Sequence, residues 1–271
     1  MITFPNAKIN LGLYVERKRE DGYHDLSTVF YPIPLTDAVE VVEAKETALL
    51  TYGNPVDCPP EKNLVMKAYR LMEEEFKLPT VAIHLYKHIP DGAGLGGGSS
   101  DATSVAKILN SMFALGLSEE EIAVRVKRLG ADCPFFAYNR PMAARGIGDL
   151  LEPVDVDLRG YTMIVVKPDV SVPTAAAYAG VTQRVPETDV EKLVAKPVGQ
   201  WKGLLVNDFE ESIFPKHPEL SAIKQSLYDA GAVYASMSGS GSAIFGLFED
   251  DNLSDIFAAK CAQPLLYKMK L

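Results

Sequence analysis

The sequence predicts an α+β protein of two domains, the second of them ferredoxin-like. The chain has 271 residues, enough for one large domain or two of ordinary size, and 47% of them are hydrophobic, which supports full cores. Apolar residues alternate along several short segments and recur at helical spacing along others. After residue 155 the predicted order is strand, helices, two strands, helix and strand, which is the ferredoxin-like order.

Predicted strands open the first domain, to which we assign residues 1–155. Alternating apolar residues predict three initial strands, which we expect to form an antiparallel meander with a charged turn at 17–22. Further along, a capping box at Ser118 opens a helix that we expect Gly130 to end. The other expected bounds are strands at 9–15, 26–31, 39–44, 81–86, 142–145 and 148–154, and helices at 64–76 and 102–113.

The second domain, residues 156–271, begins with an apolar strand. Pro173 is expected in the first turn of a short helix, and Gly231 closes a longer one. The sequence Ser238-Gly239-Ser240-Gly241 is typical of a turn between two paired strands. The expected bounds are strands at 161–167, 233–237, 243–248 and 265–269, and helices at 173–178, 220–230 and 256–261.

Composition limits the classes of partner. Lys and Arg total 27 against 36 Asp and Glu, a net charge of −9, which argues against nucleic acid and anionic membranes as partners. The three cysteines are odd in number and lack metal-ligand spacing, so we expect a reducing, cytoplasmic setting. The N-terminus does not resemble a signal peptide, and no apolar run approaches the roughly 20 residues that span a bilayer.

The strongest local signal is a glycine-rich stretch. Five of the nine residues from Gly92 to Ser100 are glycine, and the stretch joins the predicted strand at 81–86 to the predicted helix at 102–113. Glycine lets the backbone approach a ligand closely, and a helix N-terminus presents free N–H groups and positive potential to an anion. The stretch therefore predicts a phosphate-binding loop; the alternative is a flexible hinge.

Two common phosphate motifs do not fit this stretch. It lacks the Gly-Lys-[Ser/Thr] ending of a Walker A loop. Gly92, Gly94 and Gly97 match Gly-x-Gly-x-x-Gly, but a dinucleotide site also needs an acidic residue at the end of a second strand about 20 residues on. That region instead opens a helix at Ser118.

Four motifs occur in a fixed order along nearly the whole chain. They are residues 5–11 with 21–26, residues 90–100, residues 129–136 and residues 237–243. In this order and spacing they resemble those of the GHMP small-molecule kinases. The resemblance implies a two-domain GHMP kinase fold, with an N-terminal domain like domain 2 of ribosomal protein S5 and a ferredoxin-like C-terminal domain that closes the substrate cleft.

The resemblance implies an ATP-dependent enzyme with magnesium as the companion of ATP. Lys8 and Asp132 become the catalytic pair, whereas their local patterns alone indicate a solvated strand end and a helix cap or Asx turn. Asp132 would accept the proton of the attacking hydroxyl. A protein ligand for magnesium is not identified, although Ser99 or Ser100 could supply a hydroxyl. The residues assigned to ATP are Pro90, Asp91, Gly92, Ala93, Gly94, Leu95, Gly96, Gly97, Gly98, Ser99 and Ser100.

The sequences Lys-Ile-Asn-Leu at residues 8–11 and Asp-Gly-Tyr-His at residues 21–24 occur close together. This combination resembles one branch of the family, whose substrate carries cytidine diphosphate. By this resemblance Tyr23 stacks on the cytosine, His24 bonds the edge of the base, and Tyr178 gives a second aromatic face. Asn63 and Lys87 are weaker candidates for adenosine contacts, with structural or solvated roles as the alternative. The full set assigned to the substrate is Asn10, Tyr23, His24, Phe30, Thr174 and Tyr178.

The reaction implied by the resemblance transfers phosphate from ATP to the 2-hydroxyl of a methylerythritol linked to cytidine diphosphate, a step of non-mevalonate isoprenoid synthesis. The alternatives are a GHMP kinase acting on homoserine or a mevalonate-type alcohol, and a non-catalytic nucleotide-binding module. The expected partner is the small-molecule substrate, without nucleic acid or membrane, and the protein is expected to be a monomer or a weak homodimer.

Overall fold

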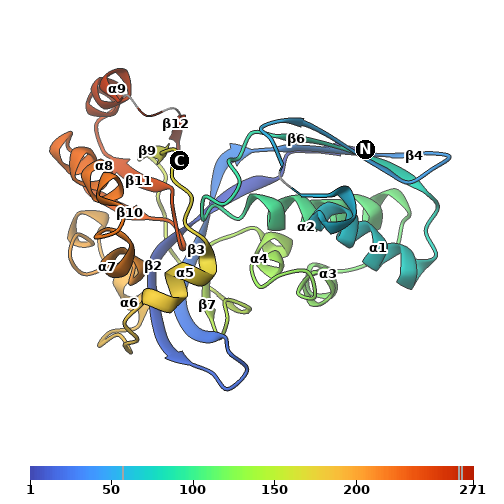
Figure 1. The fold of residues 1–271 in the computed structure, drawn as a ribbon, viewed down its shortest axis with the longest axis horizontal. Coiled ribbons are helices and arrows are strands. Elements are labelled where there is room, and N and C mark those ends of the chain that lie inside the picture. The colour runs from blue at the N-terminus through green and yellow to red at the C-terminus, as the bar shows by residue number, and fades with distance from the viewer. Residues whose placement is uncertain (57, 262, 264) are drawn as a thin grey trace. The chain divides into compact units, whose positions relative to one another are not determined.

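The computed structural model describes residues 1–56, 58–261, 263 and 265–271, which form two compact units (Figure 1). Unit 1 comprises 1–8, 35–91 and 96–140, and unit 2 comprises 9–34, 92–95 and 141–271. Strands β2 (Asn6–Lys18) and β3 (His24–Thr36) each begin in one unit and end in the other. These two units do not coincide with the predicted domains 1–155 and 156–271. The domain boundary at residue 155 stays a prediction.

Unit 1 is a sheet with helices packed on it. The strand order is β1 (Ile2–Thr3), β4 (Ala38–Glu43), β6 (Val81–Lys87) and β5 (Ala48–Gly53), in which only β5 pairs in parallel. Val39 and Val41 of β4 and the apolar residues of β6 form one core with the helices. After the short 3₁₀ helix η1 (Pro60–Lys62), these helices are α1 (Leu64–Phe76), α2 (Gly97–Met112), α3 (Glu119–Val126) and α4 (Cys133–Tyr138).

Unit 2 contains two four-stranded sheets. One has the order β2, β3, β7 (Met142–Arg145) and β8 (Leu150–Pro153). The other has the order β10 (Tyr234–Met237), β11 (Ile244–Phe248), β9 (Thr162–Lys167) and β12 (Leu265–Lys270), all antiparallel. Helices α8 (Pro218–Asp229) and α9 (Asp251–Lys260) pack on this second sheet (Figure 1). The predicted ferredoxin-like order is thus confirmed.

The remaining helices of unit 2 lie between β9 and α8. Most of these helices are too short for a helical period to stand out in the sequence. Only the first of them, opened by Pro173, was expected. They are α5 (Thr174–Gly180), α6 (Val190–Val194), the 3₁₀ helix η2 (Val198–Gln200) and α7 (Phe209–Ile213).

Two expectations about unit 1 were wrong. The three initial strands do not form a meander, because β4 pairs with β1 and β6 while β3 pairs with β7. The change of sheet occurs at Asp37, whose side chain accepts hydrogen bonds from the backbone of His88 and Ile89. The helix opened by Ser118 ends at Val126, and Gly130 is outside the left-handed region that an ending glycine adopts.

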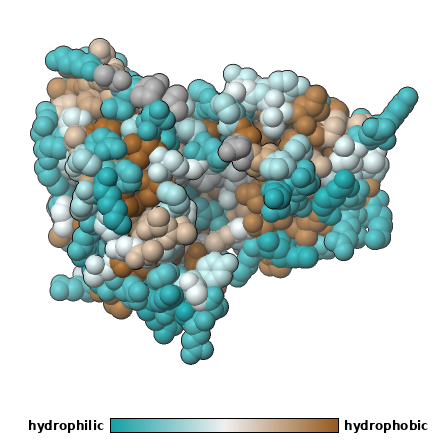
Figure 2. Space-filling view, in the orientation of Figure 1, coloured by the Kyte–Doolittle hydropathy of each residue, from teal (hydrophilic) through white to brown (hydrophobic). Residues whose placement is uncertain are grey.

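Hydrophilic side chains cover most of the face seen in Figure 2, with smaller apolar patches between them. Charged residues make up 23% of the chain, close to the share that is usual for globular domains. Among the residues that the structure describes, no helix is both long enough and apolar enough to cross a membrane.

Candidate active site

Lys8 and Asp132 form an ion pair within unit 1. Nζ of Lys8 lies 3.4 Å from Oδ2 of Asp132, and Lys8 is 3% exposed. Asp132 occupies the N-cap position of α4, yet its side chain makes no capping hydrogen bond. The carboxylate is therefore left to face the ammonium, with 35% of the side chain exposed. The pair that sequence motifs suggested is brought together by the fold, with one buried and one accessible member.

The glycine motif joins β6 to α2, as the sequence predicted. Gly96 lies at the N-cap of α2 with φ +72° and, being glycine, supplies no capping side chain. A Cβ atom at Gly96 would lie 3.1 Å from Cγ of Lys8, so the lysine stem passes directly against the motif. The first N–H groups of α2 are thus left for a ligand or water, and such groups favour an anion.

Residues 92–95, which form the first half of the glycine motif, belong to unit 2. The hydroxyl of Ser238 donates a hydrogen bond to the carbonyl oxygen of Gly94 over 2.8 Å. The backbone N–H of Ala243 donates to the carbonyl oxygen of Ala93 over 3.1 Å. Gly94 has φ +76°, and a Cβ atom there would lie only 2.0 Å from the Ser238 carbonyl oxygen. The predicted turn between β10 and β11 therefore touches the glycine motif, and it does so where only glycine fits.

Asn207 holds this turn from its other side. Its amide Nδ2 donates to the carbonyl oxygens of Met237 and Gly239, each over 2.8 Å, and its Oδ1 accepts from the N–H of Phe209. Asn207 is buried and has three of its hydrogen-bonding positions used in this way. Sequence reasoning missed this residue, because an isolated Asn carries no pattern that marks such a role.

The residues predicted to bind cytosine lie in unit 2 around the β2–β3 turn. Tyr23 is 61% exposed, and its N–H donates to the Asp21 carboxylate. The rings of His24 and Tyr178 stack, with centroids 4.9 Å apart and planes inclined by 22°. Burial, with a contribution from Lys18, lowers the pKa of His24 below its usual 6.5. Tyr178 also meets Phe209 edge-on at 4.9 Å.

The other predicted substrate residues differ in accessibility. Asn10 is buried and donates to the hydroxyl of Thr28, and its Oδ1 would lie 3.5 Å from a Cβ atom at Gly239. Phe30 is buried in β3. The exposed Thr174 places its hydroxyl 3.4 Å from that of Ser240. The fold thus collects Asn10 and Thr174 around the β10–β11 turn.

The two weaker adenosine candidates both make contacts within unit 1, and their assignment to adenosine stays a prediction. Asn63 caps α1, its side chain accepting from the N–H of Val65. Lys87 is buried and forms ion pairs with Asp37 and Asp101. The partners of Lys87 lie 50 and 14 residues away in the sequence, a separation that follows no local pattern.

The sequence led us to expect magnesium as a companion of ATP, with no protein ligand identified. The described residues contain no group of three or more His, Cys, Asp or Glu side chains that could hold a metal ion. Mg²⁺ is commonly bound through one or two protein groups together with substrate phosphates. Of the two serines at the start of α2, Ser100 is buried and Ser99 is half-buried.

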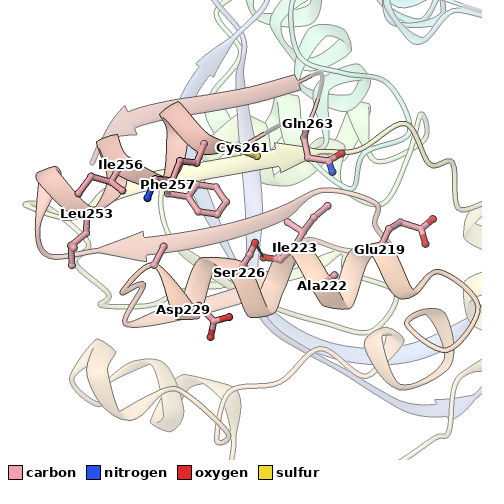
Figure 3. Close-up of a pocket in the computed structure, with 12 residues that line it drawn as sticks. Glu219, Ala222, Ile223, Ser226, Asp229, Leu253, Ile256, Phe257, Cys261 and Gln263 are labelled. Atoms are coloured by element: carbon pink, nitrogen blue, oxygen red, sulfur yellow. Dashed lines mark hydrogen bonds between the residues drawn. The ribbon is translucent and has the colours of Figure 1, made fainter.

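A groove of about 690 Å³ lies elsewhere in unit 2, between α8 and α9. Figure 3 shows Ile223 of α8 and Phe257 of α9 lining it, with Leu253 and Ile256 nearer one end. None of the predicted site residues lines this groove.

Two family models match the chain. The model described as the GHMP kinases N terminal domain matches residues 63–140, and that described as GHMP kinases C terminal matches residues 190–264. The first match includes the glycine motif and Asp132, and the second includes the β10–β11 turn.

Curated relatives match over nearly their whole length. A Bacteroides thetaiotaomicron protein named 4-diphosphocytidyl-2-C-methyl-D-erythritol kinase is 52% identical over 255 residues, 93% of each chain. A Cytophaga hutchinsonii protein of the same name is 45% identical over 98% of this chain and 100% of its own.

Among solved structures, a 4-(cytidine 5'-diphospho)-2C-methyl-D-erythritol kinase has a TM-score of 0.83 at 33% identity, covering 99% of this chain and 98% of its own. A Methanococcus jannaschii mevalonate kinase has a TM-score of 0.75 at 14% identity, covering 100% and 98%. At that identity the second likeness concerns the fold alone, whereas the first accompanies a clear sequence relationship.

Proposed function

Because this chain belongs to the GHMP kinases, and within them to the family of the 4-diphosphocytidyl-2-C-methyl-D-erythritol kinases, we propose that it phosphorylates the 2-hydroxyl of 4-diphosphocytidyl-2-C-methyl-D-erythritol with ATP. This reaction makes a precursor of isoprenoids by the non-mevalonate route. The observation that carries the proposal is the relationship at 52% identity over 93% of the chain. The ion pair between Lys8 and Asp132 supports a catalytic rather than a purely binding role.

In the proposed reaction Asp132 receives the proton of the 2-hydroxyl. The hydroxyl oxygen forms a bond to the γ-phosphorus as the bond from that phosphorus to the oxygen bridging to the β-phosphate breaks, and ADP leaves. Lys8, buried and 3.4 Å from the carboxylate, would stabilise negative charge on the reacting oxygens. The accessible side of Asp132 leaves room for the hydroxyl.

ATP is assigned to the start of α2 and the glycine motif. The uncapped N–H groups of α2 would bind the phosphates, and Gly96 lets the chain turn into the helix. Mg²⁺, when bound with ATP, would supply charge that offsets the developing negative charge on the phosphates. We assign the side chain of Ser99, a half-buried residue, to this ion when it is bound with ATP.

The cytidine part of the substrate is assigned to unit 2. The exposed ring of Tyr23 offers a face for stacking. The ring of Tyr178, one face of which stacks on His24, is assigned to the second side of the base. His24, neutral at physiological pH because its pKa is lowered, has one donor and one acceptor for the edge of the base. A cytoplasmic location, a monomer or weak homodimer, and the absence of nucleic acid partners stay predictions.

A coupled assay of ADP release tests the function. The cytidine substrate, homoserine and mevalonate are compared side by side with the same enzyme and ATP. We expect turnover with the cytidine substrate and little with the other two. Turnover with homoserine or mevalonate, but not with the cytidine substrate, would indicate a GHMP kinase of another specificity. ATP binding without turnover of any of the three would favour the non-catalytic alternative.

A further inference from the structure

Three buried charged side chains meet beside the glycine motif in unit 1. Lys87 at the end of β6 forms ion pairs with Asp37, which lies between β3 and β4, and with Asp101 of α2; its Nζ is 2.7 Å from Oδ2 of Asp101. Their exposed fractions are 5%, 2% and 1%. Charged groups are rarely buried without a structural or functional reason, because leaving water is costly.

This ion cluster of Lys87, Asp37 and Asp101 connects the two sides of the glycine motif. Oδ1 of Asp37 accepts from the N–H groups of His88, at 2.6 Å, and Ile89, at 2.8 Å, the residues that lead into the motif. Asp101 lies one helical turn after Gly97, where the motif becomes α2. A Cβ atom at Gly97 would lie 3.2 Å from Nζ of Lys87. The ammonium therefore lies directly against the start of the helix.

The charges of the cluster do not balance when all three groups are ionised. Two carboxylates would face one ammonium, and Oδ1 of Asp101 is buried without a hydrogen-bond partner among the described residues. Burial raises the pKa of Asp101 to about 8; Lys87 opposes this shift and Asp37 adds to it. Burial would lower the pKa of Lys87, but Asp101 and Asp37 raise it overall. At neutral pH the cluster thus holds one extra proton and carries no net charge.

We propose that Lys87, Asp37 and Asp101 are positioning residues for the ATP-binding end of α2, and that ATP binds best while this cluster carries no net charge. The inference rests on the ATP site of the proposed function, but not on the identity of the alcohol substrate. Loss of the extra proton places a buried negative charge next to the helix start that receives the phosphates. Because like charges repel strongly in a poorly solvated environment, ATP affinity falls.

Three other ionisable groups with shifted pKa values lie on α2 or on helices packed against it. Burial lowers the pKa of Lys107 on α2 itself, and Glu119 opposes this shift. Burial raises the pKa of Tyr69 on α1, and it raises the pKa of Cys133 on α4 to about 11. Lys8, whose stem lies against Gly96, keeps its pairing with Asp132. From two further elements, apolar residues share the buried core of α2, namely Val39 and Val41 of β4 and Ile122 and Ala123 of α3, while Glu119 of α3 interacts with Lys107.

The test is a titration with magnesium and a non-hydrolysable ATP analogue, carried out between about pH 7 and about pH 9.5, on either side of the Asp101 pKa. We expect the dissociation constant of the wild type to rise roughly ten-fold over this range, as one added charge at close distance implies. Asp101→Asn keeps the shape of the side chain without its charge. This variant should bind as the wild type does at neutral pH and lose most of the rise at high pH.

Glu120→Gln is the matched control, since it removes an exposed carboxylate from the same unit. It should keep the pH dependence of the wild type. Lys87→Met leaves two buried carboxylates unpaired and is expected to destabilise the fold, so it is combined with Asp101→Asn and Asp37→Asn to restore neutrality. The triple variant should fold and should bind the analogue without pH dependence.

Two results would overturn the inference: a wild type whose affinity is constant over the range, or an Asp101→Asn variant that keeps the full pH dependence. KM for the cytidine substrate gives the second readout, and it should be unchanged in Asp101→Asn. A wild type that binds the analogue but does not phosphorylate the cytidine substrate would contradict the proposed function while leaving the titration valid.

Discussion

Nζ of Lys8 lies 3.4 Å from Oδ2 of Asp132, although 124 residues separate them, and both belong to the same compact unit. The strand that carries Lys8 buries its ammonium, while the turn before α4 leaves Asp132 partly accessible. An accessible carboxylate beside a fixed cation suits proton transfer from a bound hydroxyl.

Asp132→Asn should keep the fold and substrate binding but lower turnover by roughly 10²–10⁴-fold, the usual contribution of a positioned acid–base group. The substitution removes charge and basicity at nearly constant shape. The measurement is kcat from coupled ADP release, with thermal unfolding as the check on the fold. Near-normal turnover in a folded variant would remove Asp132 from the catalytic role.

Lys8→Ala should lose a similar amount of turnover. Lys8→Arg should not restore it fully, because a planar guanidinium does not replace a compact ammonium in a buried space. The same assay applies, and full activity of Lys8→Arg would show that only the positive charge matters there.

Gly97→Val should raise KM for ATP far more than KM for the cytidine substrate. A Cβ atom at Gly97 would lie 3.0 Å from Cγ2 of Ile89 and 3.2 Å from Nζ of Lys87, so the start of α2 must move. Gly199→Val is the control, since Gly199 lies outside the ATP-binding set and a Cβ atom there meets nothing within 4 Å. Equal effects on both KM values would contradict a dedicated ATP loop.

Gly94→Ala should destabilise the protein more than Gly92→Ala does. Both glycines have positive φ, which costs another residue about 1–2 kcal/mol. At Gly94 the added Cβ atom also lies 2.0 Å from the carbonyl oxygen of Ser238, whereas at Gly92 it meets nothing within 4 Å. Thermal or urea unfolding measures the difference, and equal losses would show that the contact with Ser238 adds nothing.

Tyr23→Ala should weaken binding of the cytidine substrate by roughly 1–3 kcal/mol, the value of one base–aromatic stack, or about 5- to 150-fold. ATP binding should change little. Tyr86→Ala removes a similarly exposed ring, 53% against 61%, from the other unit and serves as the control. Two calorimetric titrations per variant suffice, and unchanged affinity in Tyr23→Ala would refute the stacking assignment.

His24→Ala should reduce the discrimination between cytidine and uridine forms of the substrate, because fewer hydrogen bonds then read the edge of the base. The lowered pKa of His24 keeps the imidazole neutral above pH 6.5, so the preference of the wild type should be constant from there upward. The ratio of kcat/KM for the two substrates measures it. A ratio that His24→Ala leaves unchanged would assign base recognition to another residue.

The sequence alone determined the elements with strong local patterns. Neighbouring residues predicted four features that the structure has. They are the helical spacing of apolar residues in α1, the alternation of apolar residues in β6, the capping box at Ser118 and the strand–helix junction at the glycine motif. The order of elements after residue 155 also predicted the antiparallel sheet of β9 to β12.

Only the tertiary structure decided which distant groups meet. No local pattern distinguishes a meander from the observed pairing of β4 with β1 and β6, because strand pairing depends on what the rest of the core buries. For the same reason the roles of Asn207, Asp37 and Asp101 were invisible in the sequence. Their partners lie many residues away, and only a folded core brings a buried charge to its counter-charge.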